Sequence, residues 1–251
     1  MKKILVLSLI ILIIIISSTI TYTIFMPQKI AVLTYHDFSK KRTNDEMTKN
    51  IDDFEKEMKF LKKHNYKTIK LDELECFMEK KCTLPRKSVL ITMDDGWKSQ
   101  FELALPILKK YNFNATIFHI GKYSNQKSDN YIDKEDIKII RKKYKNIELA
   151  VHSYDNHSME GYSKSKKEIK EDLEKIDNSI YKKYYAYPYG KYSKNYIKAL
   201  KESEYKLAFT FGPQKEHRKL TNEDNTYLIP RLNLSKTYPY YKFVLRMILP
   251  F

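Results

Sequence analysis

Short apolar segments alternate with segments of helical periodicity along most of this chain, and this alternation constrains the fold more than any other feature. The apolar runs have the length and composition of buried strands and lie at residues 30–35, 88–93, 114–120, 147–154, 206–211 and 226–234. Segments with apolar residues at helical spacing lie between them, at residues 50–66, 99–112, 133–144 and 193–203. Strands that alternate with helices predict an α/β fold, with a parallel sheet or barrel inside outer helices.

One further segment predicts a long amphipathic helix, because Ile169, Leu173, Ile176 and Ile180 fall on the same face at helical spacing. No repeat, low-complexity tract or obvious linker divides the chain after residue 30. A chain of 251 residues that is 42% hydrophobic can bury a proper core. We therefore expect a single catalytic domain over residues 28–251.

Residues 1–27 form a separate unit. Lys2 and Lys3 precede residues 4–26, which carry no charge. At about 1.5 Å per residue this segment is long enough to cross a hydrocarbon core of roughly 30 Å. The preceding charges predict an amino terminus inside the cell and a single-pass protein of the cell membrane with an extracellular catalytic domain. A cleaved signal peptide, which would make the protein secreted, is the alternative, although no A-x-A-like site follows the apolar run.

The chain is strongly basic, with 47 Lys plus Arg against 31 Asp plus Glu and a net charge of +16. This excess suits an anionic surface, such as lipid headgroups or an acidic wall polymer. A lysine-rich composition without a specific partner explains it as well. Nucleic acid is not an expected partner, because an exported enzyme rarely meets it.

The chain contains two cysteines, Cys76 and Cys82, in the segment LECFMEKKCTLP. An extracellular location allows a disulfide that pins the end of a helix to the following turn. Two unpaired thiols are the alternative. Neither cysteine is expected to be catalytic, since no histidine lies near them in the sequence.

Polar residues with catalytic potential follow four of the predicted strands. In a parallel sheet the carboxyl ends of the strands meet at one edge, where functional groups collect. The four positions are Tyr35-His36-Asp37, Asp94-Asp95, His152 to His157, and Arg231. Their convergence predicts a functional site at this edge of the sheet.

The segment HSYDNH carries two histidines, His152 and His157, in a loop that leaves a strand. Together with one carboxylate from the Asp94-Asp95 pair they form a two-histidine, one-aspartate set. Such a set leaves coordination positions open for water and substrate, as catalytic metal sites require. The second carboxylate of the pair then remains available for acid-base chemistry. An exposed polar loop is the alternative interpretation of this segment.

Four motifs together resemble the polysaccharide deacetylase family of carbohydrate esterases. They are TMDDG, HSYDNH, LTYHDF near the start of the chain and YAYPYG further on. The five-residue spacing of the histidines and the early LTYHDF motif are similar to the deacetylases that act on poly-β-1,6-N-acetylglucosamine in biofilms. The resemblance covers most of residues 30–235 and implies a deformed (β/α) barrel.

This resemblance implies a role for each residue of the metal site. Asp94 matches the general base of the family, while Asp95, His152 and His157 match its metal ligands. The implied cofactor is a divalent ion, commonly zinc. The chemistry agrees with this assignment, because a bound cation balances one carboxylate and polarises an amide carbonyl.

The family also implies an oxyanion donor, an arginine and a general acid. The backbone N–H of Tyr189 in YAYPYG matches the donor, but the position of the family arginine that holds the base is Ala186. Arg231 is our candidate for its replacement, with a structural surface arginine as the alternative. His36 matches the general acid of the biofilm-type relatives, and a buried structural histidine is the alternative.

Three residues near the predicted site and the carboxyl-terminal segment each leave more than one interpretation open. Tyr35 and Asp37 could line or orient His36, and Trp97 could stack on a sugar or cap the barrel. The carboxyl-terminal segment YPYYKFVLRMILPF is either an interfacial segment on the membrane or a last helix packed on the barrel.

We therefore expect a membrane-anchored, metal-dependent N-deacetylase of an extracellular N-acetylglucosamine polymer. The expected partners are this polysaccharide and, through the N-terminal helix, the membrane. Peptidoglycan deacetylation and O-deacetylation of another glycan are alternatives within the class. A catalytically silent protein that binds glycans or supports assembly, with the same fold, is an alternative outside it.

Overall fold

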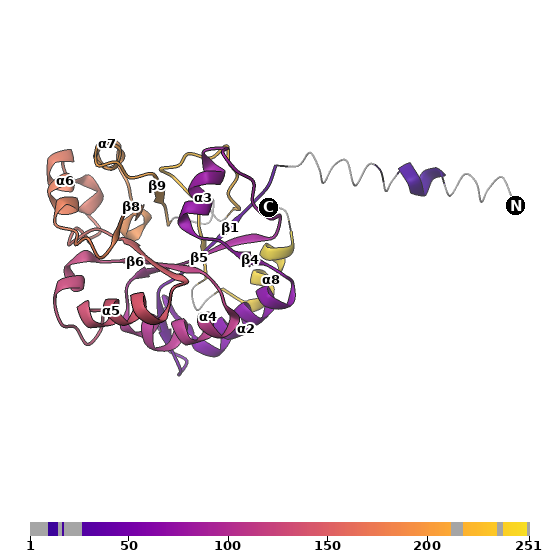
Figure 1. The fold of residues 1–251 in the computed structure, drawn as a ribbon, viewed down its shortest axis with the longest axis horizontal. Coiled ribbons are helices and arrows are strands. Elements are labelled where there is room, and N and C mark those ends of the chain that lie inside the picture. Colours follow the sequence, from indigo (N-terminus) through magenta and orange to yellow (C-terminus); the bar gives the residue numbers. More distant parts are fainter. Residues whose placement is uncertain (1–9, 15–16, 18–26, 212–217, 235–237, 250–251) are drawn as a thin grey trace, which may run out of the picture.

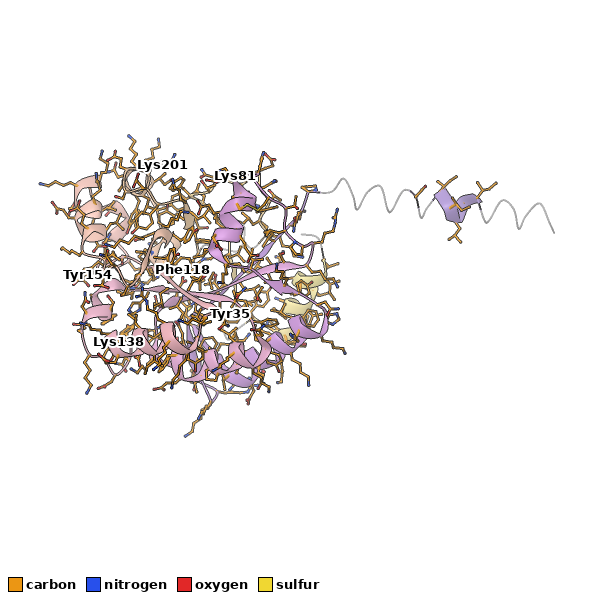
Figure 2. All side chains as sticks on the ribbon, viewed as in Figure 1. Tyr35, Lys81, Phe118, Lys138, Tyr154 and Lys201 are labelled. Atoms are coloured by element: carbon orange, nitrogen blue, oxygen red, sulfur yellow. A yellow bond between two sulfur atoms is a disulfide. The ribbon has the colours of Figure 1, made fainter. Side chains whose placement is uncertain are left out.

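A curled parallel sheet with helices packed around it forms the body of the protein in the computed structural model, which describes residues 10–14, 17, 27–211, 218–234 and 238–249 (Figure 1). Figure 2 shows Tyr35 and Phe118 within this body and Lys138 and Lys201 at its periphery. The expected α/β class with a parallel sheet is confirmed, and the sheet has the shape of a half-barrel.

The main sheet has eight strands in the order β10-β1-β5-β6-β7-β8-β9, with β4 paired to the start of β5. Their bounds are β1 Ala31–Tyr35, β4 Lys67–Thr68, β5 Ser88–Asp95, β6 Ala115–His119, β7 Ile147–Val151, β8 Tyr181–Ala186, β9 Leu207–Phe209 and β10 Leu232–Asn233. Every pairing between these strands is parallel. A separate two-stranded ribbon, which the sequence did not predict, consists of β2 Asp37–Ser39 and β3 Thr48–Asn50.

Helices α2 to α7 connect successive strands, as parallel pairing requires, and α8 follows the last strand. Their bounds are α2 Ile51–Lys63, α3 Leu71–Met78, α4 Leu105–Tyr111, α5 Lys134–Lys143, α6 Lys166–Glu174, α7 Lys194–Glu202 and α8 Tyr240–Ile248. Short helical turns lie at Gln100–Ala104, Gly121–Asn125, Gly161–Ser163 and Pro188–Gly190.

The sheet curls until one segment reaches both of its edges. Ile229 forms a parallel bridge with Phe209 at the end of β9. Three residues later, Leu232 pairs with Leu33 of β1. The segment 229–233 therefore links the first and last strands and carries Arg231 into the interior of the curl.

Side chains on the two faces of the strands enter separate hydrophobic clusters, as the two-residue period of a strand dictates. Leu33 and Ile91 on the outer face pack with α2, α4, α5 and α8. Val32 and Leu90 on the inner face pack with apolar residues of α3. A third cluster joins β7, β8 and β9 to α6 and α7.

Two predicted helices differ from the structure. The predicted long helix is wrong in length, because α6 ends at Glu174. Ile176 and Ile180 are buried beyond its end, in a turn where Asp177 accepts a hydrogen bond from the Ser179 N–H. This local side-chain bond competes with helical hydrogen bonding. The predicted helix 99–112 begins as a π-helix over Gln100–Ala104 before α4.

The two cysteines form a disulfide, Cys76–Cys82, which ties the end of α3 to the following turn. This agrees with the first of the two alternatives that the sequence left open.

The carboxyl-terminal segment contains helix α8, and Phe243 and Met247 are buried beneath it against the outer-face cluster. Part of the segment is thus a packed helix, as one of the two interpretations expected.

The predicted membrane anchor lies almost entirely outside the described residues. Within the described ranges, no helix has both the length and the apolar character needed to span a bilayer.

Candidate active site

The carboxyl edge of the sheet brings together the polar residues that the sequence singled out. Asp94 and Asp95 end β5, His36 follows β1 and His152 follows β7. Arg231 comes from the segment that closes the curl, directly before β10. Side chains that lie far apart in the sequence therefore meet at the carboxyl ends of β1, β5 and β7 and at the closing segment.

Asp95, His152 and His157 form a compact set with the geometry of metal ligands. Asp95 Oδ1 lies 3.3 Å from His152 Nε2 and 3.1 Å from His157 Nε2. One potential ligand atom from each residue lies within 4.8 Å of the other two. Ligands about 2.1 Å from a common zinc ion are separated by roughly 3.0–3.4 Å. The three side chains are therefore close enough together to hold a single divalent cation.

The hydrogen bonding of His152 prepares it as a ligand. Its Nδ1 lies 2.8 Å from the backbone oxygen of Ala186 and donates to it, which leaves the Nε2 lone pair facing Asp95. Burial alone lowers the pKa of His152, but the charge of Asp94 and the hydrogen bond and charge of Asp95 raise it overall. For Asp95, burial raises the pKa, but the hydrogen bonds from His152 and His157 bring it well below its usual value.

Unusual backbone conformations aim these side chains. Asp95 has φ of 72° and Ser153, next to His152, has φ of 64°, both in the left-handed region that costs free energy for residues other than glycine. Gly96 continues the first turn with φ of 76°, and a Cβ there would lie 2.0 Å from Nδ1 of the buried His119. Glycine is thus required at the turn that carries the two aspartates.

Asp94 is paired with Arg231 inside the curl. The Arg231 Nη1 donates to Oδ1 at 2.7 Å and the Nη2 donates to Oδ2 at 2.6 Å, a bidentate geometry. Arg231 also donates to the backbone oxygen of Thr210, and both charged side chains are at most 2% exposed. Burial raises the pKa of Asp94, but the charge of Arg231 lowers it below the usual value overall. Asp94 is therefore held as an ionised carboxylate.

His36 faces the same carboxylate from β1. Its Nε2 lies 3.9 Å from Asp94 Oδ2, and its ring packs edge-on against Phe211 with centroids 4.9 Å apart. Burial lowers the pKa of His36, and the charges of Asp94 and Asp95 offset only part of this effect. The neutral imidazole is therefore the main form at neutral pH.

Tyr189 lies on the other side of the metal set. Its ring centroid is 5.0 Å from that of His157, and its backbone has φ of 56°. The next residue, Gly190, has φ of 68°, and a Cβ there would meet the Phe211 oxygen at 1.6 Å. This turn fixes Tyr189 next to His157, and the role of its backbone N–H as an oxyanion donor stays a prediction.

Two neighbours of His36 behave differently from the expectation that they line or orient it. Tyr35 points to the outer face of the sheet, where its hydroxyl donates to Glu57, so its proposed place in the site is wrong. The reason is strand alternation, which directs consecutive residues to opposite faces. Asp37 accepts hydrogen bonds from Ser99 and Thr48 of the neighbouring elements.

Gln100 contributes to the site although its role was not anticipated. Its Nε2 donates to the backbone oxygen of His36 at 2.8 Å and to that of Asp94 at 2.5 Å. The amide therefore ties the ends of β1 and β5, which carry the candidate acid and base. A glutamine directly before the apolar run FELALPIL was the available signal, because a polar side chain that is buried with such a run needs hydrogen-bond partners.

Trp97 also supports the metal set. Its Nε1 donates to Asp95 Oδ2 at 2.9 Å, which leaves Oδ1 facing the histidines. The indole stacks on Tyr131, and Tyr131 stacks on Tyr123, with centroid separations of 4.6 and 3.9 Å. The ring is thus fixed by protein stacking, and its donor orients a candidate metal ligand.

Comparison with known proteins agrees with this site. A model of the family described as polysaccharide deacetylase matches residues 81–208, about half of the chain. The poly-β-1,6-N-acetyl-D-glucosamine N-deacetylase of Staphylococcus aureus is 31% identical over 196 residues, which cover 72% of this chain and 66% of that protein. The chain belongs to the polysaccharide deacetylase family of hydrolases.

Solved structures share the fold. The deacetylase PplD of Streptococcus pyogenes, in complex with acetate, superposes with a TM-score of 0.76 at 19% identity over 89% of this chain and all of that one. IcaB from Ammonifex degensii superposes with a TM-score of 0.74 at 20% identity over 88% of this chain and 98% of that one. The half-barrel is therefore the architecture of known deacetylases.

Proposed function

We propose that this protein is a metal-dependent hydrolase that removes N-acetyl groups from an extracellular N-acetylglucosamine polymer of the poly-β-1,6 type. The observation that carries the proposal is the adjacency of two differently prepared carboxylates. Asp95 joins His152 and His157 in a set that fits a cation, whereas Asp94 is kept ionised by Arg231. One carboxylate can hold a metal while its neighbour accepts a proton.

The metal set suits zinc, because two imidazoles and one carboxylate leave a coordination position open. A bound divalent ion would supply Lewis-acid activation of a water and of the acetyl carbonyl. Asp94 accepts the proton of the attacking water, and Arg231 holds its carboxylate in position. The backbone N–H of Tyr189 donates to the oxyanion that forms on the acetyl oxygen.

His36 returns a proton to the leaving amine in this proposal. Because burial lowers its pKa, it starts as the neutral imidazole and must acquire that proton during the reaction. Asp94 is a suitable source, since its Oδ2 lies 3.9 Å from His36 Nε2. The same short transfer accounts for the placement of acid and base on adjacent strands, β1 and β5.

The contact of Arg231 with Asp94 favours a catalytic function over glycan binding without catalysis. Ala186 has no polar side chain to hold the base, but Arg231 makes a bidentate contact with Asp94 from the segment directly before β10. A glycan-binding protein without chemistry has no need for an ionised, buried carboxylate beside a metal set.

The choice of polymer and location is also part of the proposal. The staphylococcal relative bears the name of a poly-β-1,6-N-acetyl-D-glucosamine deacetylase. The uncharged segment at residues 4–26, preceded by two lysines, suits an uncleaved anchor in the cell membrane with the catalytic domain outside.

Acetate release from two substrates tests the proposal. The purified full chain, stripped of metal and reloaded with zinc, is incubated with β-1,6-linked N-acetylglucosamine oligomers and, separately, with peptidoglycan. We expect release from the oligomers that requires the added metal. Faster release from peptidoglycan would overturn the assigned polymer. No release from either substrate by the zinc-loaded protein would overturn the enzymatic role and favour glycan binding.

A further inference from the structure

Helix α8 is apolar on both of its faces. Phe243 and Met247 face the body and are at most 2% exposed. On the outer face Tyr241, Leu245 and Ile248 recur at intervals of four and three residues and are 61%, 49% and 61% exposed. Spacing of this kind produces one continuous apolar stripe along the helix. This apolar stripe faces away from the protein body, where its exposure to water is unfavourable.

This helix lies where the described domain begins. The Ile30 N–H donates to the backbone oxygen of Leu220, at the start of β1. The neighbouring Lys219 donates through Nζ to the backbone oxygens of Met247 and Leu249, at the end of α8. Figure 1 shows α8 in yellow on the side from which the indigo end of the described domain leaves. The carboxyl end of α8 is therefore next to the residues that follow the uncharged segment.

Positive charge gathers around the same end. Helix α8 contains Lys242 and Arg246 and no acidic residue. Burial and the charges of Lys29 and Arg246 lower the pKa of Lys219 to about 8. Cations that depress each other's protonation are stabilised by an external anion. A basic cluster that suits an anionic partner thus accompanies the apolar stripe; it consists of Lys29, Lys219, Lys242 and Arg246.

A basic recess also adjoins the carboxyl end of the helix. Tyr66 donates through its hydroxyl to the backbone oxygen of Met247, and it also lines an open recess of about 460 Å³. Two lysines and three asparagines also line this recess, and none of its described lining residues is acidic; they are Lys62, Lys67, Asn65, Asn112 and Asn114. Lysine ammonium and asparagine amide groups are donors that suit phosphate oxygens.

We propose that the outer face of α8 lies in the interface of the membrane to which the chain is anchored, with the basic cluster and the recess against anionic phospholipid headgroups. The inference rests on the anchor proposed above. An interfacial helix needs an apolar face and flanking cations, and α8 with its surroundings has both. A second copy of the chain is a poorer occupant, because it would bring the same positive charge into contact with itself.

This arrangement orients the enzyme. Residue 30, β4 and the recess lie at the amino-terminal edge of the strands, where Lys67 pairs with Ser88 and Ala31 pairs with Val89. The candidate active site lies at the opposite, carboxyl edge. With α8 on the membrane, the active site opens away from the bilayer, toward polymer that has already left the membrane surface.

A fluorescent label on α8 tests the proposal in the full chain. Leu245→Cys is labelled with an environment-sensitive dye; the natural cysteines are joined in a disulfide and do not compete. The matched control is Lys198→Cys on the exposed surface of α7, a helix far from α8 in Figure 1. Each labelled chain is reconstituted into vesicles of phosphatidylglycerol and phosphatidylcholine that carry lipid-bound quenchers, and flotation reports insertion.

We expect strong quenching of the Leu245 label and little quenching of the Lys198 label. Adding Lys62→Glu and Lys242→Glu to the Leu245-labelled chain should weaken the quenching, since each cation near an anionic leaflet strengthens binding roughly fivefold. A label that remains exposed to water in floating vesicles would overturn the proposal while leaving the anchor intact. A label that is shielded from water but not quenched by lipid would indicate a protein partner and would also overturn it. A chain that fails to float would contradict both the anchor and this inference, while acetate release would still report the proposed activity separately.

Discussion

Two buried ion pairs in this protein have opposite electrostatic outcomes. Arg231 and Asp94 meet at the candidate active site, and Lys49 and Glu57 meet beneath the β2-β3 ribbon; all four side chains are at most 3% exposed. The pKa of Asp94 is lowered, whereas that of Glu57 is raised to about 7. Burial raises both, so the difference comes from the partners.

The number and type of donors explain the contrast. Arg231 gives Asp94 two parallel hydrogen bonds, and the charge of His152 also lowers the pKa of Asp94. Glu57 has Lys49 at 2.5 Å and the neutral hydroxyl of Tyr35 at 2.9 Å. A planar guanidinium satisfies both carboxylate oxygens, which a single ammonium cannot do. The comparison indicates that Arg231 keeps the site carboxylate ionised, whereas the core pair contributes packing.

Removing Arg231 should have the largest effect. In Arg231→Met the buried Asp94 loses its partner, so we expect about 3–5 kcal/mol less stability and a raised pKa for Asp94. A base is active when deprotonated, so the acid limb of the pH profile of acetate release should move to higher pH. Arg231→Lys keeps a positive charge without the bidentate geometry. Its stability and the position of its acid limb should lie between those of the wild type and those of Arg231→Met. An acid limb that stays in place in both variants would contradict the role of Arg231.

Lys49→Met should destabilise the protein without affecting the chemistry. The remaining Glu57 charge is unpaired, so we expect a loss of about 3–5 kcal/mol at pH 8. At pH 5 Glu57 is protonated and the loss should be much smaller. Urea unfolding at both pH values measures the difference, and zinc-dependent acetate release per folded molecule should be unchanged. Loss of activity in the folded variant would show that the two pairs are not independent.

Glu57→Gln should flatten the pH dependence of stability. Folded Glu57 keeps its proton up to about pH 7, while the unfolded residue releases it near its ordinary value of 4.5. The folded state therefore binds more protons in this interval, and wild-type stability should fall as pH rises through it, by about 3 kcal/mol at most. The variant lacks this titration. Equal losses between pH 5 and pH 8 in wild type and variant would contradict the raised pKa.

Trp97→Phe should have the smallest effect and concerns Asp95, the partly buried carboxylate of the candidate metal set. The variant keeps an aromatic ring on Tyr131 but loses the N–H that donates to Asp95. Loss of a hydrogen bond to a metal ligand lowers metal affinity by about 10–100-fold. Zinc titration of the apo protein measures the change, and Trp97→Tyr serves as a second ring-preserving variant. Unchanged zinc affinity would show that Trp97 only packs against Tyr131 and does not support the metal ligand Asp95.

Much of the site could be predicted from sequence, because it depends on positions relative to strand ends. His36, Asp94, Asp95 and His152 each follow or end an apolar run, and parallel pairing brings such positions together. The expected contact of Arg231 with Asp94 is also present, although Arg231 precedes β10 and reaches Asp94 from the segment that closes the curl. Their catalytic and ligand roles stay predictions.

Other features depend on tertiary contacts that leave little trace in the sequence. Gln100 acts through a π-helical turn, which residue spacing alone does not predict. The length of α6 depends on whether Asp177 bonds the following turn or continues the helix. The direction of Tyr35 could have been predicted, since it must oppose His36 across the strand.

Asp94→Asn tests the central claim most directly, because the substitution removes the proposed base and keeps the shape of the side chain. Zinc binding and acetate release from β-1,6-linked N-acetylglucosamine oligomers are measured on the same preparation. We expect zinc bound as in wild type through Asp95, His152 and His157, with acetate release lower by about 10²–10⁴-fold. Acetate release at the wild-type rate by the zinc-loaded variant would contradict the account.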